Sequence, residues 1–500
     1  MRGETESREA NAELGQADAE LEQAIVPVGM GVTNGFGDTD KTGSADQMDG
    51  DDRVGDESSM KGLKARAATK ESGGISHAWR ALRHRNFQLF FFGQTISVIG
   101  NWMTRLATTW LVYHLTHSAL LLGVVSFSGQ IVSFLLGPFA GVSVERLERR
   151  KLLVWTQALA AVQSLGLAVL TLMHVITLWE VIALTAMQGV INAFDMPGRQ
   201  SFLGMMVEDK NDLSNAIAIN SSMANGARLV GPAIAGLVIA GWGEGGCFLV
   251  DGLSYLAVIA SLLMMKIKPM AMGRPKTNML DQMREGWEYV SGFRPVRTIL
   301  LLFALVSLMG YSWAVVLPIF AVQILHGGAQ TLGWLMSAAG VGALVSALSL
   351  ALRRSVVGLT RMVQIAVAIL GVALMLLGLS HVFWVSMGLM GFVGFGMLQG
   401  AAASNTIIQS LVPEDKRGRA MSYYTMAFFG AAPFGSLMAG ALAERIGAPH
   451  TVMITGACCV GGSVWFSFEL PKIRAIMWPI YAGMGLMTTE KRPARAAVTS

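Results

Sequence analysis

Long apolar stretches separated by short polar connections follow one another between about residues 87 and 468. A helix needs about 20 mostly apolar residues to cross the roughly 30 Å hydrocarbon layer of a bilayer, and these stretches have that length. The short alternating segments of a membrane β-barrel do not occur. The pattern predicts an all-α membrane protein with twelve transmembrane helices. The predicted spans are approximately 87–113, 118–142, 152–173, 177–195, 213–240, 246–266, 298–322, 330–352, 361–379, 382–408, 419–443 and 447–468.

Composition agrees with this pattern, because 53% of the residues are hydrophobic and only 14% are charged. Three cysteines, Cys247, Cys458 and Cys459, lie in or beside apolar stretches. They are predicted to be packing residues, so we expect no disulfide framework and no metal site. The sequence does not start with a basic segment and a short apolar core, so we expect no cleavable signal peptide. No cofactor and no nucleic-acid partner are expected.

Positive charge is unevenly distributed among the connections. Nineteen lysines and arginines lie after the second, fourth, sixth, eighth and tenth spans, whereas the odd-numbered connections contain one, Arg445. Connections rich in Lys and Arg remain on the cytoplasmic side. This asymmetry predicts cytoplasmic termini and a multi-pass protein of the bacterial inner membrane.

The regions outside the spans suggest a division of the chain. Residues 1–60 contain fifteen acidic residues against four basic ones, with many Gly, Ser and Asp, and this composition predicts disorder. A basic stretch then precedes the first span and is expected to contact anionic lipid headgroups. The predicted parts are a disordered acidic then basic cytoplasmic tail, a six-helix bundle, a cytoplasmic linker, a second six-helix bundle and a cytoplasmic C-terminal tail. Their boundaries are 1–79, 80–268, 269–295, 296–470 and 471–500.

The two halves share short sequences. Glu-Asp-Lys at 208–210 recurs at 414–416, and GPAIAG at 231–236 corresponds to GSLMAG at 435–440. Six predicted spans separate the copies, so both have the same orientation, which favours a parallel duplication into two six-helix pseudo-repeats. Chance similarity of two charged loops is the alternative.

Polar residues at helical spacing form stripes within several spans. These stripes are Gln94, Ser97, Asn101, Arg105 and Thr108; Thr185, Gln188, Asn192, Asp195 and Arg199; Ser214, Ser221, Asn225 and Arg228; and Gln399, Thr406 and Ser410. A charged side chain near the bilayer centre costs at least about 2.5 kcal/mol, so these faces are expected to point at one another or at water. For the Ser and Thr members, simple helix packing is an equally ordinary role.

Arg105 and Arg228 are too far from the cytoplasmic ends of their spans to reach that surface. We expect them in an aqueous cavity, where they would favour anionic or catecholate-like cargo; a structural ion pair is the alternative. Asp251 is a possible partner or proton carrier. The positive start of its own helix could equally stabilise it as an anion.

The connection GVSVERLERRK at 141–151 resembles the signature loop of the major facilitator superfamily. The matching residues are Gly141, Glu145, Arg146, Arg149, Arg150 and Lys151, with Glu145 in place of the usual Asp and Glu148 in place of the usual Gly. Residues 97–119, 195–203 and 286–300 resemble one branch, the enterobactin-exporter-like transmembrane secretion effectors. The resemblance covers about residues 80–470.

In that superfamily the loop acts as a latch on the cytoplasmic side. The resemblance implies that Gly141 lets the second span approach the eleventh and that Glu145 lies at the positive start of the eleventh. It also places Arg149 within reach of Asp195. The predicted gate consists of Gly141, Glu145, Arg146, Arg149, Arg150, Asp195 and Arg199. A topology signal alone is the other interpretation.

ARLVGPAIAG at 227–236 is similar to the antiporter motif of proton-driven exporters, through Gly231, Pro232 and Gly236. Ala227 and Ala235 replace two of its glycines, and a plain packing motif fits as well. The proton-coupling candidates are Asp195, Asp251 and Arg228.

GWGEGG at 241–246 fits a dinucleotide pattern, but it lies between two predicted spans and is predicted to be a turn. No phosphate-binding loop of an ATPase occurs, so an ion gradient would drive any transport.

The resemblance implies the major facilitator fold, with two halves that rock about a cavity lined by the first, fourth, seventh and tenth spans. The cavity candidates are Asn101, Arg105, Gln188, Asn192, Tyr311 and Gln399. We expect a monomeric transporter, not an enzyme, that exports a siderophore-like compound, drug or other small metabolite in exchange for protons. A non-transporting sensor or scaffold on the same fold, or uptake in place of export, are the alternatives.

Overall fold

A computed structural model describes residues 80–207, 212–266, 279–353 and 355–483, and these residues form helices without any strand. The chain divides into two units after Ser72, and everything described belongs to the second unit, which begins at Gly73. The predicted tail at 1–79, part of the predicted linker at 267–278 and the last residues at 484–500 lie outside the described residues.

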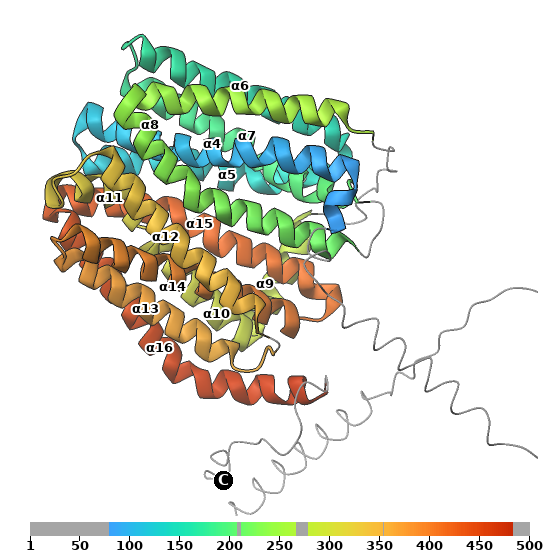
Figure 1. Ribbon diagram of the computed structural model, residues 1–500. Coiled ribbons are helices and arrows are strands. Elements are labelled where there is room, and N and C mark those ends of the chain that lie inside the picture. Colours follow the sequence, from blue (N-terminus) through green and yellow to red (C-terminus); the bar gives the residue numbers. More distant parts are fainter. Residues whose placement is uncertain (1–79, 208–211, 267–278, 354, 484–500) are drawn as a thin grey trace, which may run out of the picture. The chain divides into compact units, whose positions relative to one another are not determined.

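The helices run alongside one another as a bundle (Figure 1). The first part contains η1 (Arg80–Arg83), α4 (Arg85–Thr116), α5 (Ala119–Arg146), α6 (Arg149–Leu172), α7 (Leu178–Leu203) and α8 (Leu213–Met264). The second contains α9 (Met279–Gly292), α10 (Arg294–Leu305), η3 (Val306–Gly310), α11 (Trp313–Ile319), η4 (Phe320–Ile324), α12 (Ala329–Ala351), α13 (Leu359–Leu379), α14 (Phe383–Leu411), α15 (Glu414–Ile446) and α16 (Ala448–Gly483). Within the described residues, nine helices are long and apolar enough to cross a membrane. The helices α4 and α7 are not among the nine, because their polar stripes lower their hydropathy.

One of the nine, α8, has 52 residues and covers both the fifth and the sixth predicted spans. Its helical geometry breaks at Gly243, where φ is 73° and ψ is −179°. This backbone conformation is accessible to glycine and strained for other residues. The glycine-rich segment at 241–246 therefore contains a reversal between two helical stretches and has no preceding strand.

The seventh predicted span is irregular. It consists of α10, the π-helix η3, the short helix α11 and a second π-helix, η4. Tyr311 and Ser312 lie at the junction between η3 and α11. Pro318 lies inside α11 and lacks the amide proton of a regular helix. A π-helix widens the backbone locally and is often found at functional sites. Tyr311 directly follows such a π-helix, η3.

Two segments outside the predicted spans contain helix. The predicted linker contains α9, whose Glu285 lies 2.5 Å from Arg419 of α15 and whose Trp287 packs on Tyr423 at 5.9 Å. The predicted C-terminal tail begins in helix, because α16 continues through Pro471 to Gly483. The helix continues because Ile473, Met477 and Tyr481, spaced by four residues, are buried against the bundle.

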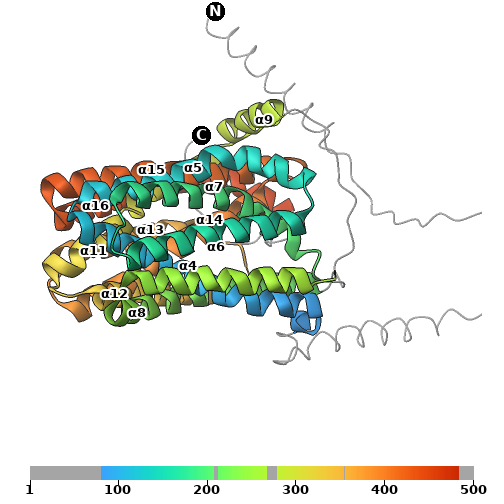
Figure 2. The same ribbon diagram turned by 90° about the horizontal axis from the view of Figure 1, so that it is seen from above.

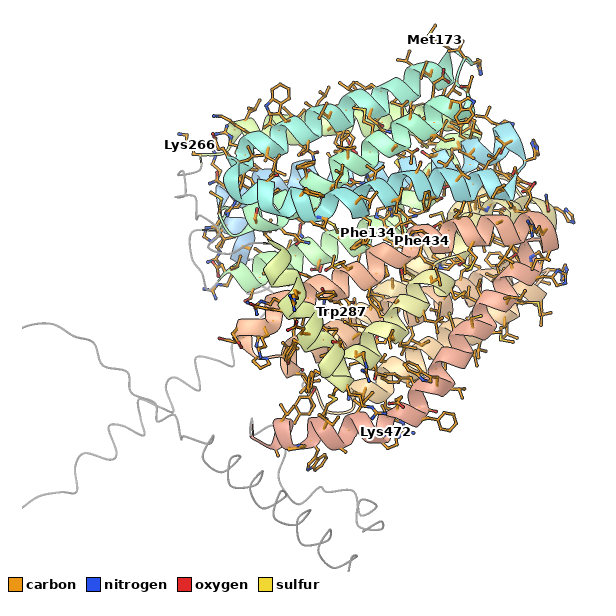
Figure 3. The ribbon with its side chains drawn as sticks, turned by 180° about the vertical axis from the view of Figure 1, so that it is seen from behind. Phe134, Met173, Lys266, Trp287, Phe434 and Lys472 are labelled. Carbon is orange, nitrogen blue, oxygen red and sulfur yellow. The ribbon has the colours of Figure 1, made fainter. Side chains whose placement is uncertain are left out.

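The bundle has two ends that differ in charge. We call the end with the connections near residues 147, 266, 353 and 412 the basic end, and the end with the turns near 117, 174 and 447 the far end. Figure 3 shows Met173 at the far end and Lys266 at the basic end. Two long contacts join the first half to the second: α5 runs along α15, and α8 runs along α12 (Figure 2).

Glycines bring these helix pairs into backbone contact at the far end. A methyl group added to Gly440 of α15 would lie 2.6 Å from the carbonyl oxygen of Ala119, the first residue of α5. The same addition to Gly236 of α8 would lie 2.9 Å from the carbonyl oxygen of Ala329, the first residue of α12. Gly236 and Gly440 are the last glycines of the two related sequences at 231–236 and 435–440. The two contacts between the halves are thus built in the same way.

The same helix pairs separate toward the basic end. Methyl groups added to Gly137 or Gly141 of α5 would meet nothing within 4 Å, and neither would one added to Gly226 of α8. The ring of Phe134 still contacts α15 at Gly430, and Figure 3 shows Phe134 and Phe434 where the two helices meet. The close contacts between the halves therefore run from the far end to mid-span and do not extend to Gly137, Gly141 or Gly226.

A pair of glycines in α14 tests the packing inside the second half. A methyl group on Gly394 would lie 1.9 Å from the carbonyl oxygen of Ala339, whereas Gly388 has nothing within 4 Å. We predict that Gly394→Ala lowers the free energy of unfolding by about 1–3 kcal/mol, as overpacking does, while the control Gly388→Ala is neutral or stabilising. Thermal unfolding of the purified protein in detergent checks this. Equal midpoints for both variants would contradict the packing.

Candidate transport site

The centre of the site is Trp102 of α4. The guanidinium carbon of Arg105, on the same helix, lies 5.2 Å from the centroid of the Trp102 ring, and that of Arg228 on α8 lies 5.3 Å from it. Both distances are within the range of cation–π contact. Arg105 is exposed, although it lies near the middle of a membrane-length helix. Two predicted residues are thus brought together on an indole that the sequence analysis did not select.

Gly231 leaves the space that the Trp102 side chain occupies. A methyl group added to Gly231 would lie 2.5 Å from the Cβ atom of Trp102. A methyl group added to Gly333 of α12 would lie 2.6 Å from the carbonyl oxygen of Pro232, the next residue. The Gly-Pro pair of the antiporter-like sequence therefore packs α8 between α4 and α12, close to Arg228.

Neither arginine has a compensating acid within the part of the chain that the structure describes. Among the described residues, no carboxylate forms an ion pair with Arg105 or Arg228, and no side-chain hydrogen bond of either guanidinium is present. The Nε atom of Arg228 is buried without a hydrogen-bond partner. Tyr311, at the break in the seventh span, and Arg105 are ionisable groups within electrostatic range of Arg228. The structural ion pair considered from the sequence is therefore absent from the described residues.

The other predicted cavity residues are placed differently. Asn192 of α7 is exposed, and Gln188 donates to its Oδ1 atom at 3.1 Å. Asn101 faces the second stretch of α8, where its amide donates to the Tyr255 hydroxyl at 3.4 Å. Tyr311 is half-buried beside Trp313 and Phe428. No hydrogen bond joins Gln188, Asn192 or Asn101 to the arginine pair.

Gln399, another predicted cavity residue, is buried in this conformation. Its side chain is only 1% exposed and accepts hydrogen bonds from Ser346 at 2.7 Å and Ser349 at 3.0 Å, both on α12. Its amide nitrogen lies 3.1 Å from the sulfur of Met362 on α13. Gln399 therefore joins three helices of the second half and does not line an open space. Helical periodicity identified its face but could not distinguish a helix neighbour from water.

Two arginines of the predicted gate form hydrogen bonds within the first half. Arg149 donates to the carbonyl oxygen of Ser201 at 3.4 Å, and Arg150 donates to that of Leu263 at 2.7 Å, so both tie α6 to other helices of the first half. Gly141 faces open space. The side chains of Glu145 and Arg146 lie outside the described residues.

Asp195 is held within the first half as well. It accepts from Thr156 at 3.0 Å and Gln157 at 2.8 Å, and its ion-pair partner is Arg199, one turn along α7. The sequence analysis proposed Arg149 for that role. The nearer cation in the same helix satisfies the carboxylate in this conformation, because an i,i+4 pair needs no movement of another element.

Asp251 lies on the opposite side of α4 from the arginine pair. It is 1% exposed, and its Oδ2 atom accepts from Thr104 at 2.8 Å and from Ser164 at 3.1 Å. Its Oδ1 atom has no hydrogen-bond partner and lies against Gly100. Asp251 is therefore no ion-pair partner of Arg105 or Arg228 in this conformation.

The halves are joined by hydrogen bonds at the far end. The carboxylate of Glu444 on α15 accepts from the hydroxyl of Ser118 at 3.0 Å and from the backbone N–H of Leu120 at 3.1 Å, at the start of α5. Gln323 donates to the Tyr113 hydroxyl at 3.2 Å. A carboxylate at a helix N-terminus is favourable, because it faces unpaired N–H groups and the positive end of the helix dipole. No hydrogen bond between described residues joins the halves at the basic end.

These features define a class of protein: a multi-pass membrane transporter in which two helical bundles meet around polar groups at mid-span. A family model for transmembrane secretion effectors matches residues 76–480. The chain belongs to this family of the major facilitator superfamily, and it is a secondary transporter of small molecules.

Characterised relatives are transporters too. The chain is 24% identical over 389 residues to the staphyloferrin A transporter of Staphylococcus aureus, and the aligned region covers 77% of this chain and 96% of that protein. It is 26% identical over 376 residues to the multidrug efflux pump Tap of Mycolicibacterium fortuitum, covering 73% and 91%. It is 21% identical over 388 residues to macrolide efflux protein A of Streptococcus pyogenes, covering 76% and 95%.

Solved structures support the fold. A peptide transporter of the POT family superposes with a TM-score of 0.63 at 12% identity, covering 78% of this chain and 96% of that one. A bacterial homologue of ferroportin, solved in an inward-facing state, superposes with a TM-score of 0.58 at 17% identity, covering 76% and 98%. At these identities the likeness concerns the fold alone.

The far-end contact of Glu444 can be tested by accessibility. We predict that Glu444→Ala opens the far end more often, because it removes two hydrogen bonds to a carboxylate worth about 1.5–3 kcal/mol each. A cysteine in place of Gln130, which bonds Ser436 across the halves at 3.2 Å, reports the opening. With the native cysteines replaced, an impermeant maleimide added at the far end should label it at least fivefold faster.

The matched control is Glu244→Ala. Glu244 lies at the same end and contacts His114 within the first half, at 3.3 Å. Its removal should leave labelling at position 130 unchanged. Equal labelling rates in the wild-type background and in Glu444→Ala would show that this carboxylate does not hold the far end closed.

Proposed function

We propose that this transporter exports a small organic molecule across the bacterial inner membrane in exchange for protons, by alternating access between two six-helix halves. The observation that carries the proposal is the pair of arginines without acidic partners, at mid-span, next to an interface that is packed at one end and separated at the other. A charge in that position is costly unless water or a ligand reaches it. The cavity of a transporter supplies both, because it admits water and binds the transported molecule.

The direction of opening follows from charge. Connections rich in Lys and Arg favour the cytoplasm, so we assign the basic end to the cytoplasm and both termini with it. The structure is then in a state open to the cytoplasm, in which an exporter collects its cargo. The similar construction of the Gly236 and Gly440 contacts supports two repeated halves, at 80–268 and 296–470, with twelve spans when α8 is divided at Gly243. We propose that the protein works as a monomer in contact with membrane lipids.

The signature loop then belongs to the other state. In the state closed to the cytoplasm, α5 and α15 would approach each other at Gly141, which has free space around it. Glu145, Arg146, Arg149 and Arg150 would come near the start of α15. Asp195 and Arg199 would keep α7 in register with α6 during this movement, since their cluster lies wholly within one half.

Asp251 is the proton carrier that the geometry favours. An ionised carboxylate without a cation is unfavourable in a buried site, so we infer that Asp251 holds a proton here, on the oxygen that has no partner. Asp195 already has its cation, Arg199, and an arginine such as Arg228 does not release its proton in proteins. Thr104, which donates to Asp251, neighbours Arg105 on α4. Movement of α4 on cargo binding would therefore change the surroundings of both sites.

The function is tested by comparing metabolites outside cells with and without the protein. We predict at least one compound that is severalfold more abundant outside cells that make the protein, and a protonophore should abolish the difference. A sensor or scaffold would give no difference. Uptake would give a difference of opposite sign, and either result would contradict export.

Proton coupling is tested at Asp251 with the compound found in that comparison. Asp251→Asn can still accept from Thr104 and Ser164, so the fold is expected to remain. In proteoliposomes we predict at least a tenfold loss of uptake driven by a pH gradient, while exchange of labelled for unlabelled compound continues. The control Glu244→Gln should behave as wild type. Gradient-driven uptake at the wild-type rate in Asp251→Asn would exclude this residue as the proton carrier.

A further inference from the structure

The arginine pair has the geometry of a two-point anion site. Both guanidinium groups are within cation–π distance of a single indole, so the distance between them cannot exceed the sum of 5.2 and 5.3 Å. They approach Trp102 from different helices, Arg105 from α4 itself and Arg228 from α8. A small molecule with two acid groups on a short spacer is long enough to bridge two cations at such a separation.

The charge of the pair calls for more than one acid group. The two guanidinium groups repel each other, and no acid among the described residues compensates them. The buried Nε–H group of Arg228 has no hydrogen-bond acceptor, and an unpaired buried donor is unfavourable. A single acid group would neutralise one charge and leave the other uncompensated. Two acid groups would neutralise both and could form the paired hydrogen bonds that guanidinium makes with carboxylate.

The aromatic groups suggest what lies between the acids. Trp102 lies beside both cations, and Tyr311, at the break in the seventh span, lies within electrostatic range of Arg228. The ring of Tyr311 packs near Phe428 at 6.4 Å. The central part of a bound molecule would therefore contact aromatic surface, while its acid groups lie toward the arginines. A ligand held in this way would touch both halves of the protein.

We propose that Arg105 and Arg228 bind the cargo through two acid groups, so that the substrate class is a small organic polyacid with at least two negative charges. This inference rests on the proposed function, under which the bound molecule is the one transported. Its chemical class is argued from the arginine pair. Cationic compounds are excluded from this position by the same two charges, and neutral compounds leave both of them uncompensated.

Binding to the purified full chain in nanodiscs, measured by calorimetry, tests the inference. The probes are glutarate and citrate, the monoacid butyrate, the uncharged diamide glutaramide and the cation ethidium. We predict saturable binding of glutarate and citrate at least tenfold tighter than that of butyrate, and no binding of glutaramide or ethidium. Binding of glutaramide or ethidium as tight as that of glutarate, or no binding of either polyacid, would overturn the proposal.

Variants locate the binding. Arg105→Gln and Arg228→Gln should each weaken glutarate binding at least tenfold, whereas Arg445→Gln, which removes an exposed arginine at the far end, should leave it unchanged. Undiminished glutarate binding in both of the first two variants would overturn the assignment to this pair. If a variant loses its fold, as judged by its melting curve, the comparison of probes on the wild-type protein decides alone.

The outcome can be separated from that of the proposed function. Proteoliposomes with a pH-sensitive dye inside report proton movement when a probe is added. Polyacid binding that depends on both arginines, with no coupled proton movement, would support the site and contradict proton antiport. Proton-coupled transport of a neutral or cationic compound, with no polyacid binding, would contradict the site and leave the transporter function intact.

Discussion

Glycine-mediated backbone contact between the two halves is the constraint on which the rest of this structure depends. Gly440 on α15 and Gly236 on α8 let their helices touch the first residues of α5 and α12, at distances that any side chain would prevent. Without a hydrophobic driving force between helices in lipid, such close packing is a principal source of helix association. Because these contacts lie at the far end, that end is packed, and we propose that the interface opens toward the basic end.

Contact between the halves at the far end alone would explain how charged side chains can lie at mid-span. Arg105 is exposed within α4, and Arg228 lies beside the same Trp102 ring. In lipid this arrangement would be prohibitive, whereas in a space that is open to water at one end it is sustainable. On the other side of α4, Thr104 donates to the buried Asp251. One helix thus contacts the arginine pair and the uncompensated carboxyl group, and its position can affect both.

Much of the fold could be predicted from the sequence, because apolar length and charge asymmetry are properties of single segments. Arg105 and Arg228 were also identifiable, since a charge inside a span and far from its cytoplasmic end is unusual whatever surrounds it. The role of Trp102 was not identifiable, because an apolar residue in a membrane helix gives no signal until its neighbours are known. Gln399 was misplaced for the related reason that Ser346 and Ser349 come from another helix.

The helices outside the predicted spans have physical causes of the same kind. The twelfth span was predicted to end near residue 468, and burial of Ile473, Met477 and Tyr481 sustains α16 beyond it. The break before Tyr311 depends on π-helical geometry, which no local periodicity reveals. The helix α9 was missed because its main support, the contact of Glu285 and Trp287 with α15, is tertiary.

The central claim is that the two halves alternate between contact at the far end and contact at the basic end. The most direct test is pulsed electron spin resonance on two spin-labelled pairs between α5 and α15, one near Ser118 and Ile446 at the far end and one near Gly141 and Gly418 at the basic end. Under a pH gradient with cargo present, the account predicts that the far-end distance lengthens as the basic-end distance shortens. Distances that stay fixed, or that lengthen together, would contradict it.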